Sequence, residues 1–224
     1  MTGAESERDA GASVVRPVPL LVIGVVLILL ACGLGALVLS RGDEPFTIDL
    51  WWNSLLASGW SPMLGGFALV MDFVGGGWFG ILVVPITGAV GLVLLRRPWS
   101  AAYFLAAQLV SAGLVQVLKH TFGRARPEEI LVLSDYGSYP SGHVASAATI
   151  AACAVVLFPR LAVVLIGAAW VVLMAFSRTY LHAHWLSDTF GGALVGVGTA
   201  LVVAAAFAVP LTRELPARSS PRAA

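Results

Sequence analysis

Charged residues are scarce in this chain. Asp, Glu, Lys and Arg make up 11% of its 224 residues, whereas soluble domains contain about 25%. Hydrophobic residues make up 58%, and the formal net charge is only +1. This composition excludes an ordinary soluble domain, and it provides no strongly basic surface for binding nucleic acid.

Cysteine is also rare. The two cysteines, Cys32 and Cys153, each lie within an apolar run, so we expect buried free thiols. Two such residues exclude a disulfide framework and a cysteine-rich zinc site. The chain has four histidines and a single lysine, so its few ionisable side chains are informative.

Long apolar runs are abundant. A helix needs about 20 apolar residues to cross a bilayer. The charge-free stretch 17–40 is longer than the core of a signal peptide, which has about 7–15 residues, and it is typical of a membrane span. The sequence therefore predicts an all-α, polytopic membrane bundle of about six transmembrane helices plus an interfacial helix. The expected spans are 17–40, 78–95, 99–118, 144–158, 161–177 and 189–209.

The segment between the first two expected spans has a mixed character. Trp51, Trp52 and Trp60 lie among polar residues, a pattern typical of an interfacial helix. Residues 63–77 are apolar and predict a partly embedded helix that leads into the next span. Asp72 interrupts this run. It would either cap the interfacial helix or face the polar loops at one end of the bundle, and the sequence does not decide between these roles.

The chain is interpreted as one membrane domain, 17–209, between a disordered cytoplasmic tail, 1–16, and a basic cytoplasmic tail, 210–224. With six spans, eight of the 13 Lys and Arg residues fall on the side of the termini. Cytoplasmic loops carry the excess of positive charge. We therefore expect a multi-pass protein of the cell membrane with both termini in the cytoplasm and the histidine-bearing loops outside.

All four histidines fall in the two loops of that outer side, together with most of its basic residues. A bundle of helices can bring two such loops together at one end. Arginine binds phosphate through paired hydrogen bonds, and lysine adds a point charge. The two loops therefore predict an anion site at one membrane face. Its histidines and cations are Lys119, His120, Arg124, Arg126, His143, Arg178, His182 and His184.

The stretch YPSGHVASAA, 139–148, places polar residues directly before an apolar helix. Ser141 is a good helix cap, and the free N–H groups of a helix start bind anions. Gly142 allows the backbone to approach a ligand closely, and His143 would then lie where it can donate a proton. Taken alone, the stretch is more typical of a plain helix cap with a surface histidine.

The stretch SRTYLHAHWLSD, 177–188, carries a second pattern. His184 and Asp188 are four residues apart and would share one face of a helix. A carboxylate beside an imidazole fixes its tautomer and raises its basicity, as a nucleophilic histidine requires. An interfacial ion pair explains the same spacing equally well.

Three segments together resemble the signature of the type-2 phosphatidic acid phosphatase superfamily, which includes membrane lipid phosphatases and soluble vanadium-dependent haloperoxidases. The family motifs are Lys-x6-Arg-Pro, Pro-Ser-Gly-His and Ser-Arg-x5-His-x3-Asp. Each motif position is filled here, in the same order and with the same spacing, within a motif core at 119–188. The matching stretches are KHTFGRARP, 119–127, PSGH, 140–143, and SRTYLHAHWLSD, 177–188.

The resemblance implies a role for each matched residue. His184 would attack phosphorus and form a phosphohistidine, Asp188 would orient His184, and His143 would act as the general acid. The phosphoryl oxygens would be held by Lys119, Arg126, Ser141, Gly142 and Arg178. The resemblance to the phosphatases implies a reaction without a metal, and we expect no cofactor. The implied partners are the bilayer and a lipid phosphate, such as undecaprenyl diphosphate, phosphatidylglycerophosphate or phosphatidic acid, and no nucleic acid.

Three alternatives stay open at this stage. One is a phosphotransferase of the same fold with an acceptor other than water. The others are a small anion transporter and a metalloprotein that uses His143, His182 and His184. Arg124, His120 and His182 match no motif position and are interpreted as rim residues. The sequence favours no particular oligomeric state.

Overall fold

The computed structural model describes residues 16–42 and 44–214, and within these residues the chain is helical without a β-strand. The expected all-α fold is therefore confirmed. The expected tails 1–16 and 210–224 fall mostly outside the described residues. The helices are α1 (Pro17–Ser40), α2 (Thr47–Ser58), α3 (Pro62–Gly75), α4 (Val84–Leu94), α5 (Pro98–Phe122), α6 (Gly142–Leu157), α7 (Leu161–Tyr180), α8 (Leu186–Ala206) and α9 (Ala208–Glu214).

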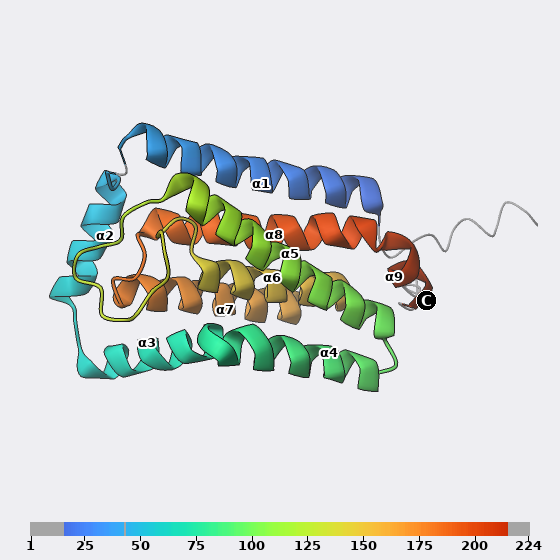
Figure 1. Cartoon of the computed structure of the whole chain (residues 1–224). Helices are drawn as coiled ribbons and strands as arrows, with labels where there is room; N and C mark the ends of the chain where they lie inside the picture. The colour runs from blue at the N-terminus through green and yellow to red at the C-terminus, as the bar shows by residue number, and fades with distance from the viewer. Residues whose placement is uncertain (1–15, 43, 215–224) are drawn as a thin grey trace, which may run out of the picture.

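The long helices run side by side as a bundle (Figure 1). Helix α2 crosses one end of this bundle, next to the loop that joins α5 to α6 and the turn that joins α7 to α8. Helix α9 and the start of α1 lie at the opposite end. The three motif segments are thus collected at the end that α2 covers.

Four helices, α1, α5, α7 and α8, are long and apolar enough to cross a membrane. Helix α3 and the helical segment 79–94 pass the same test together, with a bend of 46° between them. Helix α6 is apolar but shorter, with 16 residues. The expected embedded helix at 63–77 and the expected span at 78–95 are therefore two parts of one bent unit.

The bend follows from three consecutive glycines, at 75–77. Gly77 has a φ of +54°, which residues with a side chain rarely adopt. A π-helical segment, Phe79–Val83, follows before the regular α-helix resumes at Val84. Helix breaks of this kind are common where a segment serves a functional site.

Helix α8 packs against α1, α5 and α6. Its contact with α1 is close because small residues meet there. A Cβ at Gly198 would lie 2.8 Å from the backbone oxygen of Gly24, and a Cβ at Gly24 would lie 2.7 Å from that of Gly198. Small residues at a helix crossing allow two backbones to approach in a membrane.

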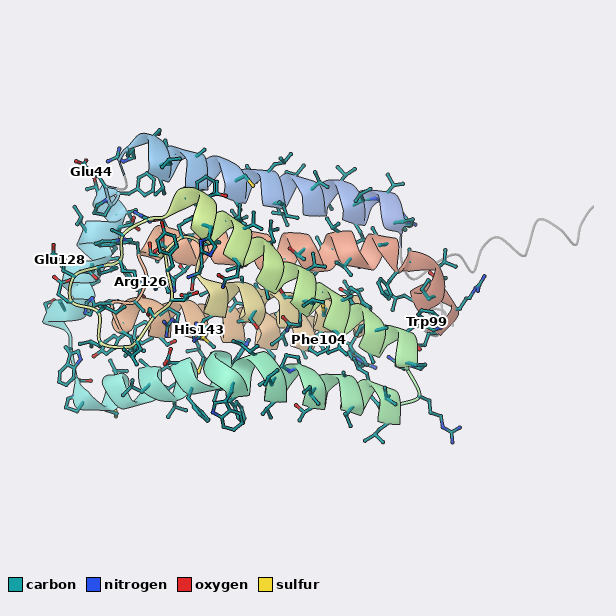
Figure 2. All side chains as sticks on the ribbon, viewed as in Figure 1. Glu44, Trp99, Phe104, Arg126, Glu128 and His143 are labelled. Atoms are coloured by element: carbon teal, nitrogen blue, oxygen red, sulfur yellow. The ribbon has the colours of Figure 1, made fainter. Side chains whose placement is uncertain are left out.

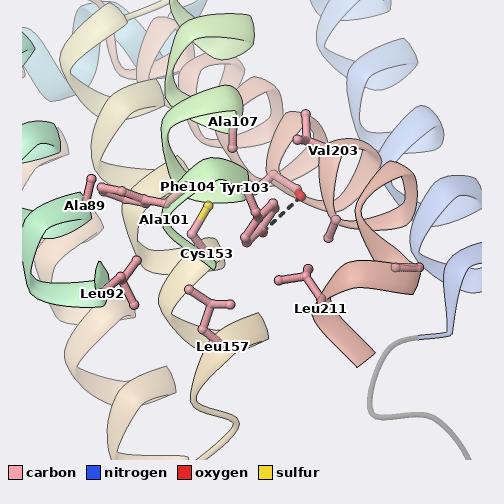
Figure 3. Packing of buried hydrophobic residues seen from close by; sticks show 13 residues of the cluster. Ala89, Leu92, Ala101, Tyr103, Phe104, Ala107, Cys153, Leu157, Val203 and Leu211 are labelled. Carbon is pink, nitrogen blue, oxygen red and sulfur yellow. Dashed lines mark hydrogen bonds between the residues drawn. The ribbon is translucent and has the colours of Figure 1, made fainter. Parts of the chain in front are cut away.

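The end of the bundle away from α2 has an apolar core (Figure 3). Ala89, Phe104, Cys153 and Leu211 belong to one buried cluster there. The hydroxyl of Tyr103 lies in the same cluster and donates a hydrogen bond of 3.1 Å to the backbone oxygen of Ala200. This end of the molecule provides packing, whereas the polar residues of the motifs gather at the other end.

Two expectations differ in detail from the structure. Cys153 is buried, as expected, but Cys32 is only partly buried. Residue 210 lies inside α9, whose Leu211 is fully buried, so the chain stays in the fold beyond the expected boundary. Glu214 then accepts hydrogen bonds from the backbone nitrogens of Trp99 and Ser100, at 2.8 and 2.7 Å. These N–H groups at the start of α5 have no partner within their own helix.

Candidate active site

The motif residues converge on one cavity of about 810 Å³. Five of the eight predicted site residues line it: Lys119, Gly142, His143, Arg178 and His184. Figure 2 shows His143 and Arg126 toward the end that α2 covers, and Phe104 and Trp99 toward the other end. The sequence prediction that these loops meet at one end of the bundle is therefore correct.

More of these residues lie within helices than the sequence predicted. Helix α5 continues to Phe122, so Lys119 lies in its last turn and not in a loop. Helix α7 continues to Tyr180, so Arg178 is also helical. Both cations are buried. A helical backbone fixes the direction of such long side chains better than a loop would.

His184 is deeply buried in the turn before α8. Its side chain is 2% exposed, and its Nε2 atom lies 3.3 Å from NH1 of Arg126. Arginine can only donate, so Nε2 must accept and carries no proton. The ring proton of the neutral imidazole is then on Nδ1, and Nε2 keeps a lone pair.

The electrostatic surroundings keep His184 neutral. Burial lowers the pKa of His184 well below the usual range, and the charges of Arg178, Arg126 and Lys119 lower it further. A histidine in water has a pKa of about 6.5. The imidazole is therefore uncharged at neutral pH.

Asp188 faces His184, but not by way of a shared helix face. His184 precedes the helix, and Asp188 lies in its first turn. The distance from His184 Nδ1 to Asp188 Oδ2 is 3.7 Å, which makes this an ion-pair distance rather than a hydrogen bond. The same Oδ2 accepts a hydrogen bond of 2.8 Å from the backbone nitrogen of Trp185.

Arg124 is part of this arrangement, and its interpretation as a rim residue is wrong. Its side chain is 0% exposed, and NH1 donates to Asp188 Oδ1 at 2.6 Å. Its NH2 donates to Oδ2 of Asp49 at 2.8 Å. Asp49 comes from α2 and also accepts hydrogen bonds from the backbone and side chain of Ser187. We call Asp49, Arg124 and Asp188 the buried charge ladder.

No sequence pattern selects Asp49, because it lies close to Trp51 and Trp52 in an interfacial segment. The interpretation of His182 as a rim residue is also wrong. His182 is buried, and its Nδ1 lies 2.6 Å from Oδ1 of Asn53 in α2. His120 is exposed and stacks on Tyr136, as a rim residue would.

Two of the predicted phosphate-binding cations share one carboxylate. Lys119 Nζ and Arg126 NH2 each lie 2.9 Å from Oδ1 of Asp135, and both also donate to the backbone oxygen of Gly137. Burial opposes ionisation of Asp135, but the hydrogen bond and charge of Lys119 outweigh it and hold the pKa of Asp135 below its usual range. Its side chain is 55% exposed. Sequence reasoning missed Asp135 because it lies in a polar loop without a pattern.

The third cation, Arg178, pairs with a different carboxylate. Its NH1 atom contacts Oδ1 of Asp72 on α3. The same Oδ1 lies 3.2 Å from Nε2 of His143. Asp72 was the one acidic residue in an apolar run, and ionisable groups in such runs usually have a function. That signal could have placed Asp72 in the site.

Several buried polar atoms of the site have no hydrogen-bond partner within the described part of the chain. They are Ser141 Oγ, Arg178 Nε and His184 Nδ1. Ser141 occupies the cap position of α6, but its hydroxyl caps no backbone N–H, contrary to the expectation. Unpaired buried polar groups are costly and need an explanation. An oxyanion held between α6 and α7 would give Ser141 Oγ and Arg178 Nε a partner, whereas His184 Nδ1 faces Asp188.

Residues suited to holding a metal do not gather in the same way. Across residues 16–42 and 44–214, no three His, Cys, Asp or Glu side chains are placed as metal ligands. The donor set at the cavity consists instead of cations and imidazoles. Such a set suits a phosphate or another tetrahedral anion.

Comparisons with known proteins find phosphatases among the similar chains. The family model described as "PAP2 superfamily" matches residues 100–210. Lipid A 1-phosphatase of Rhizobium johnstonii is 32% identical over 124 residues, which cover 49% of each chain, so this match spans about half of that relative. Phosphatidylglycerophosphatase B of Bacillus subtilis is 31% identical over 146 residues, which cover 61% of this chain and 71% of that one.

A solved structure agrees over a longer stretch. The transmembrane PAP2 type phosphatidylglycerolphosphate phosphatase from Bacillus subtilis superposes with a TM-score of 0.67 and 26% identity. The superposition covers 80% of this chain and 93% of that one. With its three motifs, its helical membrane fold and these relatives, the chain belongs to the PAP2 superfamily.

Proposed function

We propose that this chain is an integral membrane phosphatase that hydrolyses phosphomonoesters or diphosphates of lipids through a phosphohistidine on His184. The observation that carries the proposal is the neutral, buried His184 beside Lys119, Arg126 and Arg178 at one cavity. A phosphoryl group needs cations for its oxygens and a nucleophile in line with its leaving group. These residues supply both.

In the proposed reaction, the lone pair of His184 Nε2 attacks phosphorus. The bond from phosphorus to the leaving oxygen breaks, and its electron pair stays on that oxygen, which takes a proton from His143. Water then attacks the phosphohistidine and returns its proton to His143. The second step releases inorganic phosphate and restores neutral His184.

The cations act on the phosphoryl oxygens during both steps. Lys119, Arg126 and Arg178 neutralise the negative charge that spreads over these oxygens in the transition state. Ser141 Oγ and the free N–H groups at the start of α6 complete the cradle. Asp188, held by Arg124, offsets the positive charge that His184 acquires when it bonds to phosphorus.

The shape of the cavity favours a lipid. Beyond the polar residues, its walls are apolar side chains of the bent unit and α5, such as Ile81, Leu82, Leu105 and Leu109. These segments have the length and composition of membrane spans. The headgroup would meet the cations while the hydrocarbon chain stays between helices.

We infer an orientation from the loops. The side with fewer Lys and Arg carries the motifs, so the active site would face outward, with both termini in the cytoplasm of a multi-pass cell-membrane protein. Candidate substrates are undecaprenyl diphosphate, phosphatidylglycerophosphate and phosphatidic acid. The relatives named above add the 1-phosphate of lipid A to these candidates.

Phosphate release from these four lipids by the detergent-purified protein tests the proposal. The assay contains a chelator, and vanadate serves as a phosphate mimic. We expect release that resists the chelator and stops with vanadate. A substrate labelled in its phosphate should also label the protein in an acid-labile bond that the His184→Asn variant cannot form.

The controls separate the alternatives. Added alcohol that captures the labelled phosphate in preference to water would identify a phosphotransferase. A folded wild-type protein that releases no phosphate, and that forms no labelled intermediate, would overturn the proposal.

A further inference from the structure

Asp72 is an acidic side chain in a membrane-embedded helix. It is the only charged residue in the stretch 62–94, which forms the bent unit of α3 and α4. A charge at such a position costs free energy, so an ionisable residue there usually has a function. The three motifs give Asp72 no role, because it lies well upstream of Lys119.

The contacts of Asp72 are with two motif residues. Its Oδ1 pairs with NH1 of Arg178 and lies 3.2 Å from Nε2 of His143. Its backbone oxygen also lies 3.3 Å from the same Nε2. Asp72 thus presents two acceptors to one nitrogen of His143.

The glycine break makes this contact possible. A Cβ at Gly76 would collide with His143 Nε2, and a Cβ at Gly75 would collide with Met174. The imidazole of His143 therefore fills space that only glycine leaves free. Helix α3 ends at this point, so its last turns deliver Asp72 to the ring.

The hydrogen bonds fix the tautomer of His143. A carboxylate paired with arginine accepts hydrogen bonds and does not donate them. Nε2 of His143 must therefore carry a proton, whatever the state of Nδ1. Nδ1 makes no hydrogen bond to another described residue, and the His143 ring lines the cavity. With Nε2 protonated, a proton for transfer sits on Nδ1 only in the imidazolium form of His143, so the acid is the charged ring.

This arrangement mirrors the one at His184. There, Asp188 faces Nδ1 and leaves Nε2 for the attack on phosphorus. At His143, Asp72 holds Nε2 and leaves Nδ1 for the leaving group. Burial and the charge of Arg178 lower the pKa of His143, and the hydrogen bond and negative charge of Asp72 oppose this by stabilising the protonated ring.

We propose that Asp72 is the positioning residue of the general acid: it holds Nε2–H of the His143 imidazolium, so that Nδ1 faces the leaving oxygen and delivers its proton there. The proposal rests on the proposed function, since it assigns a role within that reaction. Asp72 acts through His143 and does not contact the phosphoryl group itself.

The role predicts a dependence on the leaving group. An alcohol that leaves a lipid phosphate needs a proton, whereas nitrophenolate leaves without one. Loss of Asp72 should therefore slow the hydrolysis of a lipid phosphate and spare that of nitrophenyl phosphate. General acid catalysis contributes about 10²–10⁴-fold, and its positioning residue should account for about 10- to 100-fold of this.

The test compares Asp72→Asn with wild type on phosphatidic acid and on nitrophenyl phosphate. Asp135→Asn is the matched control, because it removes a carboxylate from Lys119 and Arg126 without touching His143. We expect Asp72→Asn to lower kcat on phosphatidic acid by about 10- to 100-fold and kcat on nitrophenyl phosphate by less than about threefold. Asp135→Asn should change both substrates by the same factor.

A double-mutant comparison shows whether Asp72 acts through His143. In a His143→Gln background, Asp72→Asn should cause no further loss on phosphatidic acid. Inhibition by vanadate, which has no leaving group, should persist in Asp72→Asn and shows that the site is assembled. If Asp72→Asn does not fold, Asp72→Ser provides the same comparison with a smaller side chain.

Two results would overturn the proposal. Equal losses on both substrates would make Asp72 a structural residue, and faster turnover of both would make it a competitor of phosphate for Arg178. Failure of the proposed function is a separate result, because wild type itself would then hydrolyse neither substrate.

Discussion

The two histidine–aspartate pairs of the site differ in how closed they are. The side chains of His184 and Asp188 are 2% and 0% exposed, whereas those of His143 and Asp72 are 22% and 29% exposed. Asp188 is held by Arg124, which belongs to the buried charge ladder. Asp72 is held by Arg178, which also faces the cavity.

The difference fits the two tasks. A nucleophile gains from being fixed before the substrate arrives, because each misplacement lowers the rate. An acid must reach a leaving group that differs between substrates, so its pair borders the cavity. In the proposed reaction, the closed pair, His184 and Asp188, would act on the phosphoryl group, and the open pair, His143 and Asp72, would act on the leaving group.

The largest expected loss of activity comes from replacing His184, the proposed nucleophile of the closed pair. His184→Asn should lower phosphate release by about 10⁴-fold or more, because no covalent intermediate can form. The loss should be the same for lipid phosphates and nitrophenyl phosphate. The melting temperature of the purified variant serves as the folding control, and activity within tenfold of wild type would contradict the assignment.

Replacing His143, the proposed acid of the open pair, should lower kcat by a factor that depends on the substrate. His143→Gln should lower kcat on phosphatidic acid by about 10²–10⁴-fold and should affect nitrophenyl phosphate far less. Steady-state rates on both substrates provide the measurement. An equal loss on both would mean that His143 binds the phosphoryl group rather than protonating the leaving oxygen.

The buried charge ladder behind the closed pair can be tested through stability. Arg124→Met leaves Asp49 and Asp188 buried without their cation, and breaking such a pair costs about 3–5 kcal/mol. We expect a lower melting temperature together with slower turnover. Arg160→Met, in the turn before α7, provides an exposed control that should leave both quantities unchanged.

The pH dependence of kcat/KM should distinguish His184 from a histidine in water. Burial and the charges of Arg178, Arg126 and Lys119 lower the pKa of His184, so its neutral form persists below the usual pKa of about 6.5. The acid limb of the kcat/KM profile should therefore lie below that pH. Arg126→Gln removes one of these charges and should move the limb to higher pH; a limb that stays fixed would assign it to another group.

The smallest effect is expected at the exposed histidine. His120 stacks on Tyr136 and contacts neither pair. His120→Gln should keep phosphate release within about twofold of wild type, since surface substitutions usually change little. A larger loss would indicate that His120, a third histidine, takes part in substrate binding.

Much of the fold was predictable because apolar runs determine where membrane helices form. The start and end of α1 agree with the expected span, 17–40. The bend at residues 75–77 was harder to predict, because hydropathy describes the apolar character of a run and not the path of its backbone. The glycines mark the break, but the direction of Asp72 depends on packing against α6 and α7.

The candidate site was predictable where a motif spans it. His143, His184 and the three predicted phosphate-binding cations come together as expected, since the motif spacing places them near helix ends. Arg124, Asp49 and Asp135 were not predictable in the same way. Their importance arises from contacts between residues that lie far apart in the chain, and no local pattern records those contacts.

Because Asp72 comes from α3 and not from a motif, its contacts affect how far the activity of one relative can be assigned to another. Asp49 and Asp72 both lie outside residues 100–210, so a search with the family model alone passes over one carboxylate that contacts Arg124 and another that contacts Arg178 and His143. Two relatives with identical motifs could then accept different leaving groups. Substrate annotation within this family would gain from aligning the helices before the first motif in space, where a functional equivalent of Asp72 can sit at an unrelated sequence position.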